Sequence, residues 1–365
     1  MSRPVRIAVD AMGADEAPRV EVEGALSAVG DADVEIVLVG DEARLNEELR
    51  ARAPRGVPAR VTIKHAPEVI TMHDPPAIAV KQKKRSSMRL CFDLAKSGEV
   101  DALVSAGNSG AMMACGLFVL GRSPGVERPA IVTTLPTPTG HVVMLDVGAN
   151  VEPRPLVLAQ FAVLGAVYSR LRHQREKPRV GLLSNGSEEH KGTALTRETH
   201  ALLERVHTPP PGFAPEFEYL GYIEGRDIFR GEVDVVVTDG FTGNVLLKGF
   251  EGLAEAVLHM VRGEVTRGSV REKLGGWLMM PALRRFRRRT DYAETGGAPL
   301  LGVEGVALSS HGGSDVRAIK NAILTARQFS QLGLAEALRK AVRDHAFLWD
   351  DEPASPGGAV GGLPA

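Results

Sequence analysis

The stretch VDVVVTDGFTGNVLLKGFEG, residues 233–252, carries the first signal of the fold class. Its first half, 233–237, is a β-branched apolar run broken only by Asp234, as in a strand that is buried on both faces. A polar bend containing Gly240 and Gly243 follows, and apolar residues then recur at helical spacing. A strand, a glycine loop and a helix in this order leave N–H groups free at the helix start, where an anion binds well. Taken alone, the loop is more typical of an ordinary tight turn.

The same plan recurs three times, which strengthens the functional interpretation. Residues 100–112 read VDALVSAGNSGAM, residues 142–150 read VVMLDVGAN, and residues 5–18 read VRIAVDAMGADEAP. Four strands that end in small polar residues predict one sheet edge lined with donors, acceptors and bare amides. In open α/β sheets the carboxyl edge of the strands is where ligands bind.

The order of the segments predicts the architecture. Apolar strand patterns at 5–9, 34–39 and 61–64 alternate with helical patterns at 16–29 and 41–52. This alternation predicts an α/β fold with a doubly wound, mostly parallel sheet in a Rossmann-like three-layer architecture. The runs 131–135 and 142–145 are close enough in sequence to form a hairpin. We expect one α/β domain over residues 1–350, with a Pro/Gly/Ala-rich disordered tail at 351–365.

Composition excludes several classes of function. The 365 residues carry a net charge of −1, so no global field attracts nucleic acid. Cys91 and Cys115 lie in apolar helical patterns and are predicted to be free, buried thiols. We expect no metal and no cofactor, since no Cys or His cluster has ligand spacing. Without a signal-peptide h-region or an 18-residue apolar run, the chain is expected to be soluble and cytoplasmic.

Two cationic segments remain open to more than one interpretation. Lys81, Lys83, Lys84 and Arg85 precede Ser86 and Ser87; four such cations usually form a solvated face, but with the hydroxyls they can hold a phosphate. Residues 264–291 form an amphipathic helical insertion, divided by Pro281 into two short helices. Its membrane or carrier-contact candidates are Trp277, Leu278, Met279, Arg284 and Arg285. An interfacial membrane helix and a dimer interface fit this segment equally well, and RNA binding fits it less well.

Residues 5–345 together resemble one family, the PlsX phosphate acyltransferases of bacterial phospholipid synthesis. The resemblance rests on these segments: DAMGADEAP (10–18), SSM (86–88), SAGNSGA (105–111), ERPA (127–130), LDVGAN (145–150), GSEEHKG (186–192), EGRDIF (224–229), DGFTGNVLLKGFEG (239–252) and SHG (310–312). It implies reversible transfer of a long-chain acyl group from acyl carrier protein to inorganic phosphate. It also implies a fold similar to those of the phosphotransacetylases and the isocitrate and isopropylmalate dehydrogenases. The implied assembly is a homodimer that associates peripherally with the membrane and supplies a downstream membrane glycerol-3-phosphate acyltransferase.

The chain departs from the family pattern at a few positions. Ala14 and Ser109 stand where Gly and Thr are usual, and Lys81 stands where Arg is common. Lysine keeps the charge but loses the bidentate fork. The pair Ser184-Asn185 replaces Asn-Ile and is the least conservative change.

The loops and the resemblance define the candidate site. The chain has no G-x-S-x-G elbow and no Cys paired with a base, which favours direct attack by phosphate on the thioester. By analogy with phosphorylated side chains, whose second pKa is roughly 6, the phosphate dianion is expected to be plentiful at neutral pH. The catalytic candidates are Lys191 as the phosphate cation, Asn108 and Asn244 as amide donors, and His311 as a phosphate ligand or the acid for the leaving thiolate. The remaining phosphate- or substrate-binding candidates are Asp10, Lys81, Ser86, Ser87, Gly107, Ser109, Gly110, Asn150, Asp239, Gly240, Gly243 and Lys248.

Each candidate also has a purely structural interpretation. Asparagines in bends often only stabilise the turn, and Asp10 and Asp239 are expected mainly to orient loops. Two other functions remain open: a short-chain phosphotransacetylase-like enzyme that uses coenzyme A, and a non-catalytic scaffold recruited to membranes. A decarboxylating dehydrogenase is disfavoured, since no G-x-G-x-x-G follows the first strand and no clear carboxylate cluster for Mg²⁺ is present.

Overall fold

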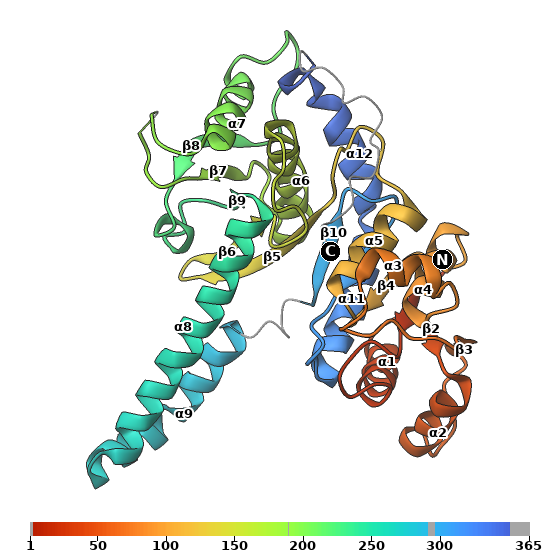
Figure 1. Cartoon of the computed structure of the whole chain (residues 1–365). Coiled ribbons are helices and arrows are strands. Elements are labelled where there is room, and N and C mark those ends of the chain that lie inside the picture. The colour runs from red at the N-terminus through yellow and green to blue at the C-terminus, as the bar shows by residue number, and fades with distance from the viewer. Residues whose placement is uncertain (1–2, 189, 291–295, 351–365) are drawn as a thin grey trace.

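The computed structural model of the chain describes residues 3–188, 190–290 and 296–350 (Figure 1), without the side chains of residues 283, 284 and 286–290. The strands are β1 (Val5–Asp10), β2 (Val34–Gly40), β3 (Val61–His65), β4 (Ala102–Ser105), β5 (Ala130–Thr137), β6 (Gly140–Leu145), β7 (Arg179–Leu183), β8 (Glu218–Ile223), β9 (Val235–Val237), β10 (Ala298–Leu301) and β11 (Ala307–Ser309). The α-helices are α1 (Arg19–Asp31), α2 (Glu42–Arg52), α3 (Pro76–Gln82), α4 (Ser87–Lys96), α5 (Ser109–Cys115), α6 (Pro155–His173), α7 (Ala194–Glu204), α8 (Gly240–Arg267), α9 (Val270–Thr290), α11 (Val316–Gln331) and α12 (Leu334–Asp344). The predicted tail, 351–365, lies outside the described residues.

The strands form one sheet in the order β3-β2-β1-β4-β11-β10-β5-β6-β9-β7-β8. Most neighbours are parallel, as predicted, and β5 and β6 form the predicted hairpin. The pairs β11–β10, β10–β5 and β5–β6 are antiparallel. Three reversals in a row mean that β6, β9, β7 and β8 run opposite to β1, β2, β3, β4 and β11. The expectation of one shared carboxyl edge is therefore wrong, and the sheet has two sets of strand ends.

Alternation along the strands distributes the core over both faces of the sheet. In β1, Ile7 and Val9 pack in one apolar cluster while Ala8 packs in another. In β9, Val235 and Val237 join the first cluster and Val236 joins a third. Successive side chains of a strand point to opposite faces, so a continuous apolar strand such as β9 fits a sheet covered by helices on both sides. This confirms the doubly wound architecture.

The helices α8 and α9 form an arm that projects from the body (Figure 1). The arm begins at Gly240, earlier than the predicted insertion at 264–291. The predicted break at Pro281 is also wrong, because Pro281 lies inside the single helix α9. The arm exposes large apolar side chains, with Trp277 69% and Leu278 64% exposed. Among the described residues, no helix combines the length and apolar character needed to cross a membrane.

Candidate functional site

The first set of strand ends belongs to β1, β4 and β11. Asp10 pairs in register with Ser105, and Ser105 pairs with Ser309, so the three strands end at the same level. The Asp10 carboxylate accepts a hydrogen bond from the Ser105 hydroxyl at 2.7 Å and one from the Met12 amide at 3.3 Å. Burial raises the pKa of Asp10, and the nearby hydroxyls of Ser87 and Ser105 oppose that rise. Asp10 thus ties the loops after β1 and β4 together.

Two glycines allow these loops to touch. A Cβ on Gly13 would lie 2.7 Å from the Gly107 nitrogen and 3.0 Å from an Asp10 oxygen. The Gly107 amide already donates to the Ser105 hydroxyl at 3.1 Å. The predicted phosphate cradle at 107–110 therefore does not include the Gly107 N–H. The amides of Ser109 and Gly110, at the exposed start of α5, have no hydrogen-bond partner within the described part of the chain.

A carboxyl group that the sequence reading missed supports the first loop from beneath. Glu21 in α1 is fully buried, and its Oε1 accepts the Ala14 amide at 2.9 Å. Its Oε2 has no hydrogen-bond partner among the described residues. Burial raises the pKa of Glu21 from 4.5 to about 8. The sequence does contain a signal for this buried carboxyl. Glu21 stands between Val20 and Val22 in the helical stretch VEVEG at 20–24.

The raised pKa of Glu21 predicts a pH-dependent stability. Between pH 4.5 and about 8 the folded state holds a proton that the unfolded chain releases, so stability falls as pH rises through this window and levels off above it. Replacing Glu21 by Gln keeps an acceptor for the Ala14 amide and removes the titration. We expect the wild type to lose on the order of 3 kcal/mol more than Glu21→Gln between pH 5 and pH 8. Urea unfolding at several pH values measures this, and parallel curves for the two proteins would refute it.

Asn108 holds a neighbouring segment instead of presenting its amide to a ligand. Its Oδ1 accepts the Ala111 amide and caps α5, while its Nδ2 donates to the carbonyls of Thr71, Met72 and Asp74 at 3.2–3.3 Å. Because both ends of the amide are occupied, the prediction that Asn108 donates to phosphate or oxyanion is not supported. The geometry makes it a positioning residue.

The loop after β11 joins the same group. The Asp15 amide donates to the Gly312 carbonyl at 2.9 Å, and the hydroxyls of Ser310 and Ser314 lie 2.7 Å apart. The Nδ1 of His311 accepts the Gly313 amide at 3.1 Å, and the His311 side chain is exposed. The structure therefore brings Asp10, Gly107, Asn108 and His311 to one end of the first half of the sheet.

Ser86 and Ser87 begin α4 near these loops. Both side chains are buried. The Ser86 hydroxyl donates to the Lys83 carbonyl at 2.8 Å, while the Ser87 hydroxyl makes no hydrogen bond of normal geometry among the described residues. Lys81 is exposed, with its ammonium 5.4 Å from the centre of the Phe118 ring. Lys81 is thus engaged with an aromatic ring and not with the serines.

The second set of strand ends belongs to β6, β9 and β7, where Leu145, Val237 and Leu182 stand side by side. Asp146 follows β6, is fully buried, and organises this end of the sheet. It accepts the amides of Ile131 at 3.0 Å and Asn150 at 2.6 Å, the Ala149 amide, and the Asn150 side chain at 3.0 Å. Burial raises the pKa of Asp146, and the hydrogen bonds from these groups oppose that rise. Sequence reasoning quoted Asp146 within LDVGAN but did not single it out.

Asn150 is also occupied by the protein itself. Its Nδ2 donates to the Pro129 carbonyl at 2.8 Å as well as to Asp146. Its backbone carbonyl accepts the Gly240 amide at 2.7 Å. The expectation that Asn150 donates to phosphate or oxyanion is therefore not supported either.

The glycine bend at 239–244 packs tightly against this loop. Asp239 caps α8 by accepting the Thr242 amide and hydroxyl at 2.8 and 2.7 Å, and its carbonyl accepts the Gly243 amide at 2.9 Å. With the Gly240 amide bonded to Asn150, these three amides are unavailable to an anion. The expected anion cradle at Gly240 and Gly243 is thus wrong; a Cβ at Gly240 would lie 2.7 Å from the Asn150 carbonyl oxygen, so this glycine serves close packing.

Near the start of α8, the side chains of Asn244 and Lys248 have no partner among the described residues. The Asn244 side chain lies beside Gly148, with its Nδ2 3.6 Å from where a Cβ on Gly148 would be. It makes no hydrogen bond among the described residues. Lys248 lies one helical turn further along α8. Its side chain is exposed and makes no ion pair with any described residue. Asn244 and Lys248 are therefore available to a ligand.

Lys191 stands in the loop after β7, adjacent in the sheet to the loop after β9. This loop is closed by Asn185, whose Oδ1 accepts the Gly192 amide at 2.9 Å. Helix α7 begins at Ala194 with Thr193 as its cap, so Lys191 lies in the loop and not at the predicted helix start. The Lys191 stem crosses Gly186, and its ammonium makes no ion pair with the residues that the structure describes. The divergent Asn185 thus has a loop-closing role.

The cysteines do not supply a nucleophile. Cys91 and Cys115 are free and buried, as predicted. Burial raises the pKa of Cys115 to about 12 and that of Cys91 well above its ordinary value. Both are therefore protonated at neutral pH, and a thiolate is the reactive form. Within the described residues, no group of three or more His, Cys, Asp or Glu side chains is placed to hold a metal ion.

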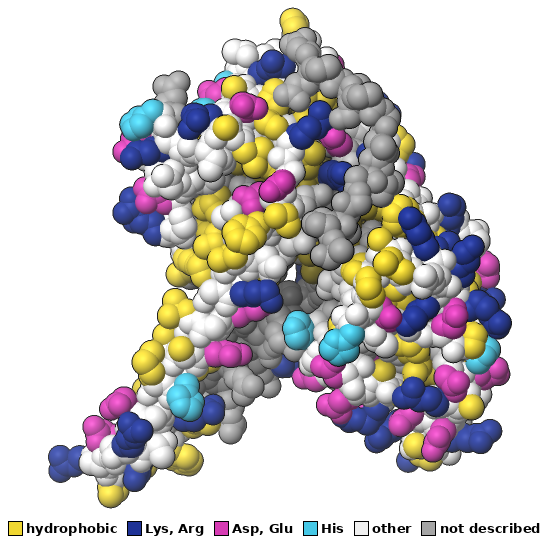
Figure 2. Space-filling model, in the orientation of Figure 1, with side chains coloured by type: hydrophobic (Ala, Val, Ile, Leu, Met, Phe, Trp, Pro, Cys, Tyr) yellow, Lys and Arg dark blue, Asp and Glu magenta, His cyan; other side chains and the backbone are white. Residues whose placement is uncertain are grey.

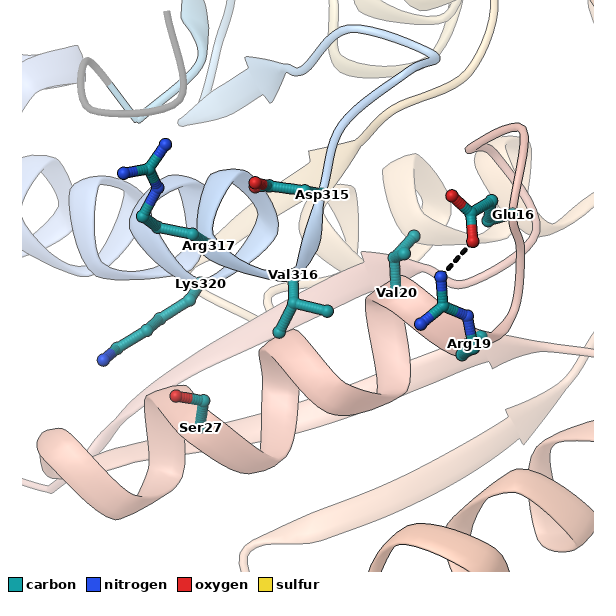
Figure 3. Close-up of a pocket in the computed structure, with 8 residues that line it drawn as sticks. All are labelled: Glu16, Arg19, Val20, Ser27, Asp315, Val316, Arg317 and Lys320. Atoms are coloured by element: carbon teal, nitrogen blue, oxygen red, sulfur yellow. Dashed lines mark hydrogen bonds and ion pairs between the residues drawn. The ribbon is translucent and has the colours of Figure 1, made fainter. Parts of the chain in front are cut away.

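A surface pocket of about 570 Å³ lies between α1 and α11 (Figure 3). Its cations are already engaged, since Arg19 pairs with Glu16 and Lys320 pairs with Asp31. None of the residues predicted from the sequence lines it. We therefore do not assign this pocket to the reaction.

Comparisons with known proteins identify the class. A family model described as "Fatty acid synthesis protein" matches residues 5–337. Phosphate acyltransferase of Geotalea uraniireducens is 50% identical over 345 residues, which is 94% of this chain and 96% of the relative. Phosphate acyltransferase of Geobacter sulfurreducens is 52% identical over 334 residues, 92% of this chain and 93% of the relative.

Two solved structures are similar in fold. EutD phosphotransacetylase from Staphylococcus aureus has a TM-score of 0.55 at 15% identity, and a phosphotransacetylase from Streptococcus pyogenes has 0.56 at 19% identity. Each comparison covers 90% of this chain and 94% of the other. The relatives and the fold define an α/β enzyme of the acyltransferase class. The chain belongs to the PlsX family of phosphate acyltransferases, and the expected family is thereby confirmed.

Proposed function

We propose that the chain transfers a long-chain acyl group from the thioester of acyl carrier protein to inorganic phosphate, releasing acyl-phosphate for phospholipid synthesis. The observation that carries the proposal is the 50% identity, over 94% of the chain, to a protein named phosphate acyltransferase. A phosphate oxygen forms a bond to the acyl carbon, the carbon–sulfur bond breaks, and the thiolate takes up a proton. The reverse step uses the same groups, so the transfer is reversible.

The phosphate is best served by the second set of strand ends. Lys191 in the loop after β7 and Lys248 on α8 are cations that make no ion pair with any residue in the described part of the chain. Asn244 lies between the loops after β6 and β9 with an unoccupied amide. A charge-assisted hydrogen bond from lysine and a neutral one from asparagine are suited to a dianion. No side chain needs to act as a nucleophile, since positioning and electrostatic stabilisation suffice.

The first set of strand ends is proposed to receive the thioester across the same hollow as the bound phosphate, because direct attack requires a phosphate oxygen to reach the acyl carbon. The amides of Ser109 and Gly110 are unoccupied donors for the oxyanion, and the exposed His311 is the candidate acid for the thiolate. Asp10, Asn108 and Asn150 position the loops. The surface is hollowed between the arm and the half of the molecule that contains β1–β4 (Figure 2), and we propose that the substrates enter there.

An assay of phosphate-dependent thioester cleavage tests this function. Palmitoyl carrier protein and acetyl-coenzyme A are each incubated with enzyme and phosphate, and acyl-phosphate is trapped with hydroxylamine. We expect efficient turnover of the carrier-bound long chain alone. Preference for acetyl-coenzyme A would support a short-chain phosphotransacetylase, which the fold alone allows. Absence of phosphate-dependent cleavage with both would favour a scaffold.

We propose that the arm contacts a membrane surface or a second copy of the chain, beside the downstream glycerol-3-phosphate acyltransferase that takes the product. The support is its exposed apolar surface, including Trp277, Leu278 and Met279 (58% exposed), with the exposed Arg285 nearby. The side chain of Arg284 lies outside the described part. Apolar and cationic side chains together suit an anionic lipid surface.

Glutamates at the arm separate membrane binding from dimerisation. The double change Trp277→Glu and Leu278→Glu is expected to weaken binding to anionic phospholipid vesicles at least about tenfold, because each side chain contributes roughly 1.5–3 kcal/mol when buried. The matched control places glutamate at Val57 and Leu332, both 42% exposed and outside the arm. Vesicle sedimentation and the mass in solution are measured. Unchanged vesicle binding together with dissociation to a monomer would assign the arm to the dimer interface.

A further inference from the structure

We propose that acyl carrier protein docks on a surface around α3 and not on the arginine-bearing arm. This inference rests on the proposed function and specifies where its carrier-protein substrate binds. The surface, called the α3 patch below, combines three exposed apolar side chains with three exposed cations. Its members are Met72, Ile78, Phe118, Lys81, Lys84 and Arg85.

The apolar part of the α3 patch consists of three large side chains that are exposed. Ile78 is 53% exposed, Met72 46% and Phe118 39%. Lys81 follows Ile78 by three positions on α3, which places both on one face of the helix, and its ammonium lies over the Phe118 ring. At the place of α3 in Figure 1, Figure 2 shows apolar side chains with Lys and Arg side chains beside them. A partner that docks here needs both apolar contact and negative charge.

The cations of the α3 patch keep their charge available. Lys81, Lys84 and Arg85 have no ion pair with any described residue. Lys83 behaves differently, since its ammonium bonds to Asp74 at 2.6 Å and to the Val69 carbonyl at 2.9 Å. The hydrogen bond from Lys83 is the largest cause that lowers the pKa of Asp74 to about 2, so this carboxylate beside the patch is paired.

Two other carboxylates lie close to the patch, Glu68 and Asp15. A Cβ on Gly312 would lie 2.7 Å from Met72 Cε and 3.3 Å from Asp15 Oδ1. Glu68 accepts the Arg85 backbone amide at 2.8 Å, and no ion pair joins it to the Arg85 guanidinium. The patch therefore retains a net positive charge, which is complementary to an acidic carrier protein. Complementary charge mainly speeds encounter and selects the partner, and its effect falls with salt.

The α3 patch is directly connected to the first set of strand ends. Asn108 holds the carbonyls of Thr71, Met72 and Asp74. A Cβ on Gly110 would lie 2.6 Å from Pro76 Cγ, and one on Gly312 would lie 2.7 Å from Met72 Cε. The patch thus borders both the free amides at the start of α5 and the loop that carries His311. A carrier protein seated there has a short path for its prosthetic arm to these loops.

Charge reversal at Lys84 and Arg85 tests the proposal. The double variant Lys84→Glu with Arg85→Glu is assayed with palmitoyl carrier protein and with palmitoyl-pantetheine, a thioester that lacks the protein. We expect KM for the carrier substrate to rise about 10–100-fold at low salt, with little change in kcat and none in turnover of palmitoyl-pantetheine. The control variant Arg50→Glu with Arg55→Glu has the same charge change at exposed, unpaired cations near the end of α2. The control is expected to leave KM within about twofold.

The possible results are decisive. An unchanged KM, or an equal rise in the control, overturns docking at the α3 patch. A rise only in Arg284→Glu with Arg285→Glu overturns it in favour of the arm. If the wild type does not cleave the carrier thioester, the proposed reaction fails. Direct binding of palmitoyl carrier protein to wild type and variant then decides the docking proposal separately, because loss of binding in the variant alone supports it.

Discussion

Replacing Lys191 by Ala is expected to lower kcat/KM for phosphate about 10²–10³-fold while the protein stays folded. Lys191 stands in the loop after β7, beside the second set of strand ends, and its ammonium has no ion pair with the described residues. Removing it leaves no comparable charge in that loop to bind the dianion. Because the side chain crosses Gly186 at the surface and is partly exposed, little core packing is lost.

Two further variants sharpen the Lys191 experiment. Lys191→Arg keeps the charge with a different shape and is expected to retain part of the activity. Lys177→Ala removes an exposed lysine that precedes the same strand, β7, at its opposite end, and is expected to behave as wild type. Rates are measured over a range of phosphate concentrations, with thermal unfolding as the folding control. Near-normal turnover by Lys191→Ala would remove Lys191 from the mechanism.

Replacing Gly243 by Ala is expected to destabilise the protein by roughly 3 kcal/mol and to abolish most activity. The new Cβ would lie closer than 3.0 Å to the Asp146 carbonyl oxygen, a separation that real Cβ atoms essentially never show. The start of α8 or the Asp146 loop must therefore move. Either movement disturbs the amides that Asp146 accepts and displaces Asn244, which is the next residue on α8.

Gly249→Ala is the matched control for that change. Gly249 lies in the same helix, and a Cβ there would meet nothing within 4 Å. Alanine in an open helical position stabilises a helix by up to about 1 kcal/mol relative to glycine. Chemical denaturation and the phosphate-dependent assay are compared for both variants. Wild-type stability and turnover in Gly243→Ala would show that the close approach of α8 to Asp146 is not needed.

Much of the architecture could be predicted from local patterns. The apolar runs at 5–9 and 34–39 are strands, the run at 233–237 contains the shorter strand β9, and Asp41 caps α2 as expected. Such elements follow from side-chain alternation and capping, which depend on neighbours in sequence. The reversal of direction at β10 and β5 could not be predicted, because a strand's pattern of burial is the same whether its neighbour runs parallel or antiparallel.

The candidate site could likewise be predicted only in part from the sequence. The residue types at the strand ends correctly predicted that polar groups gather there. Asp10, Gly107, Asn108 and His311 do lie together at the first set of strand ends. Which of their groups are free is not a local property. Asn108 donates to carbonyls of the 71–74 segment, and Asn150 donates to the Pro129 carbonyl, so neither amide is available.

Residues 233–252 show most clearly what the sequence determines and what depends on the tertiary structure. Their apolar run, glycine bend and helical spacing were sufficient to predict β9 and the start of α8, since those features depend on the backbone preferences of adjacent residues. The same residues predicted an anion cradle, but the Gly240 amide is bonded to the carbonyl of Asn150 and the Gly243 amide to that of Asp239. A free N–H at a helix start depends on what packs against it. Folding brings the Asp146–Asn150 loop onto this helix start. Asn244 and Lys248 on α8 and Lys191 in the adjacent loop keep donors that are unoccupied among the described residues.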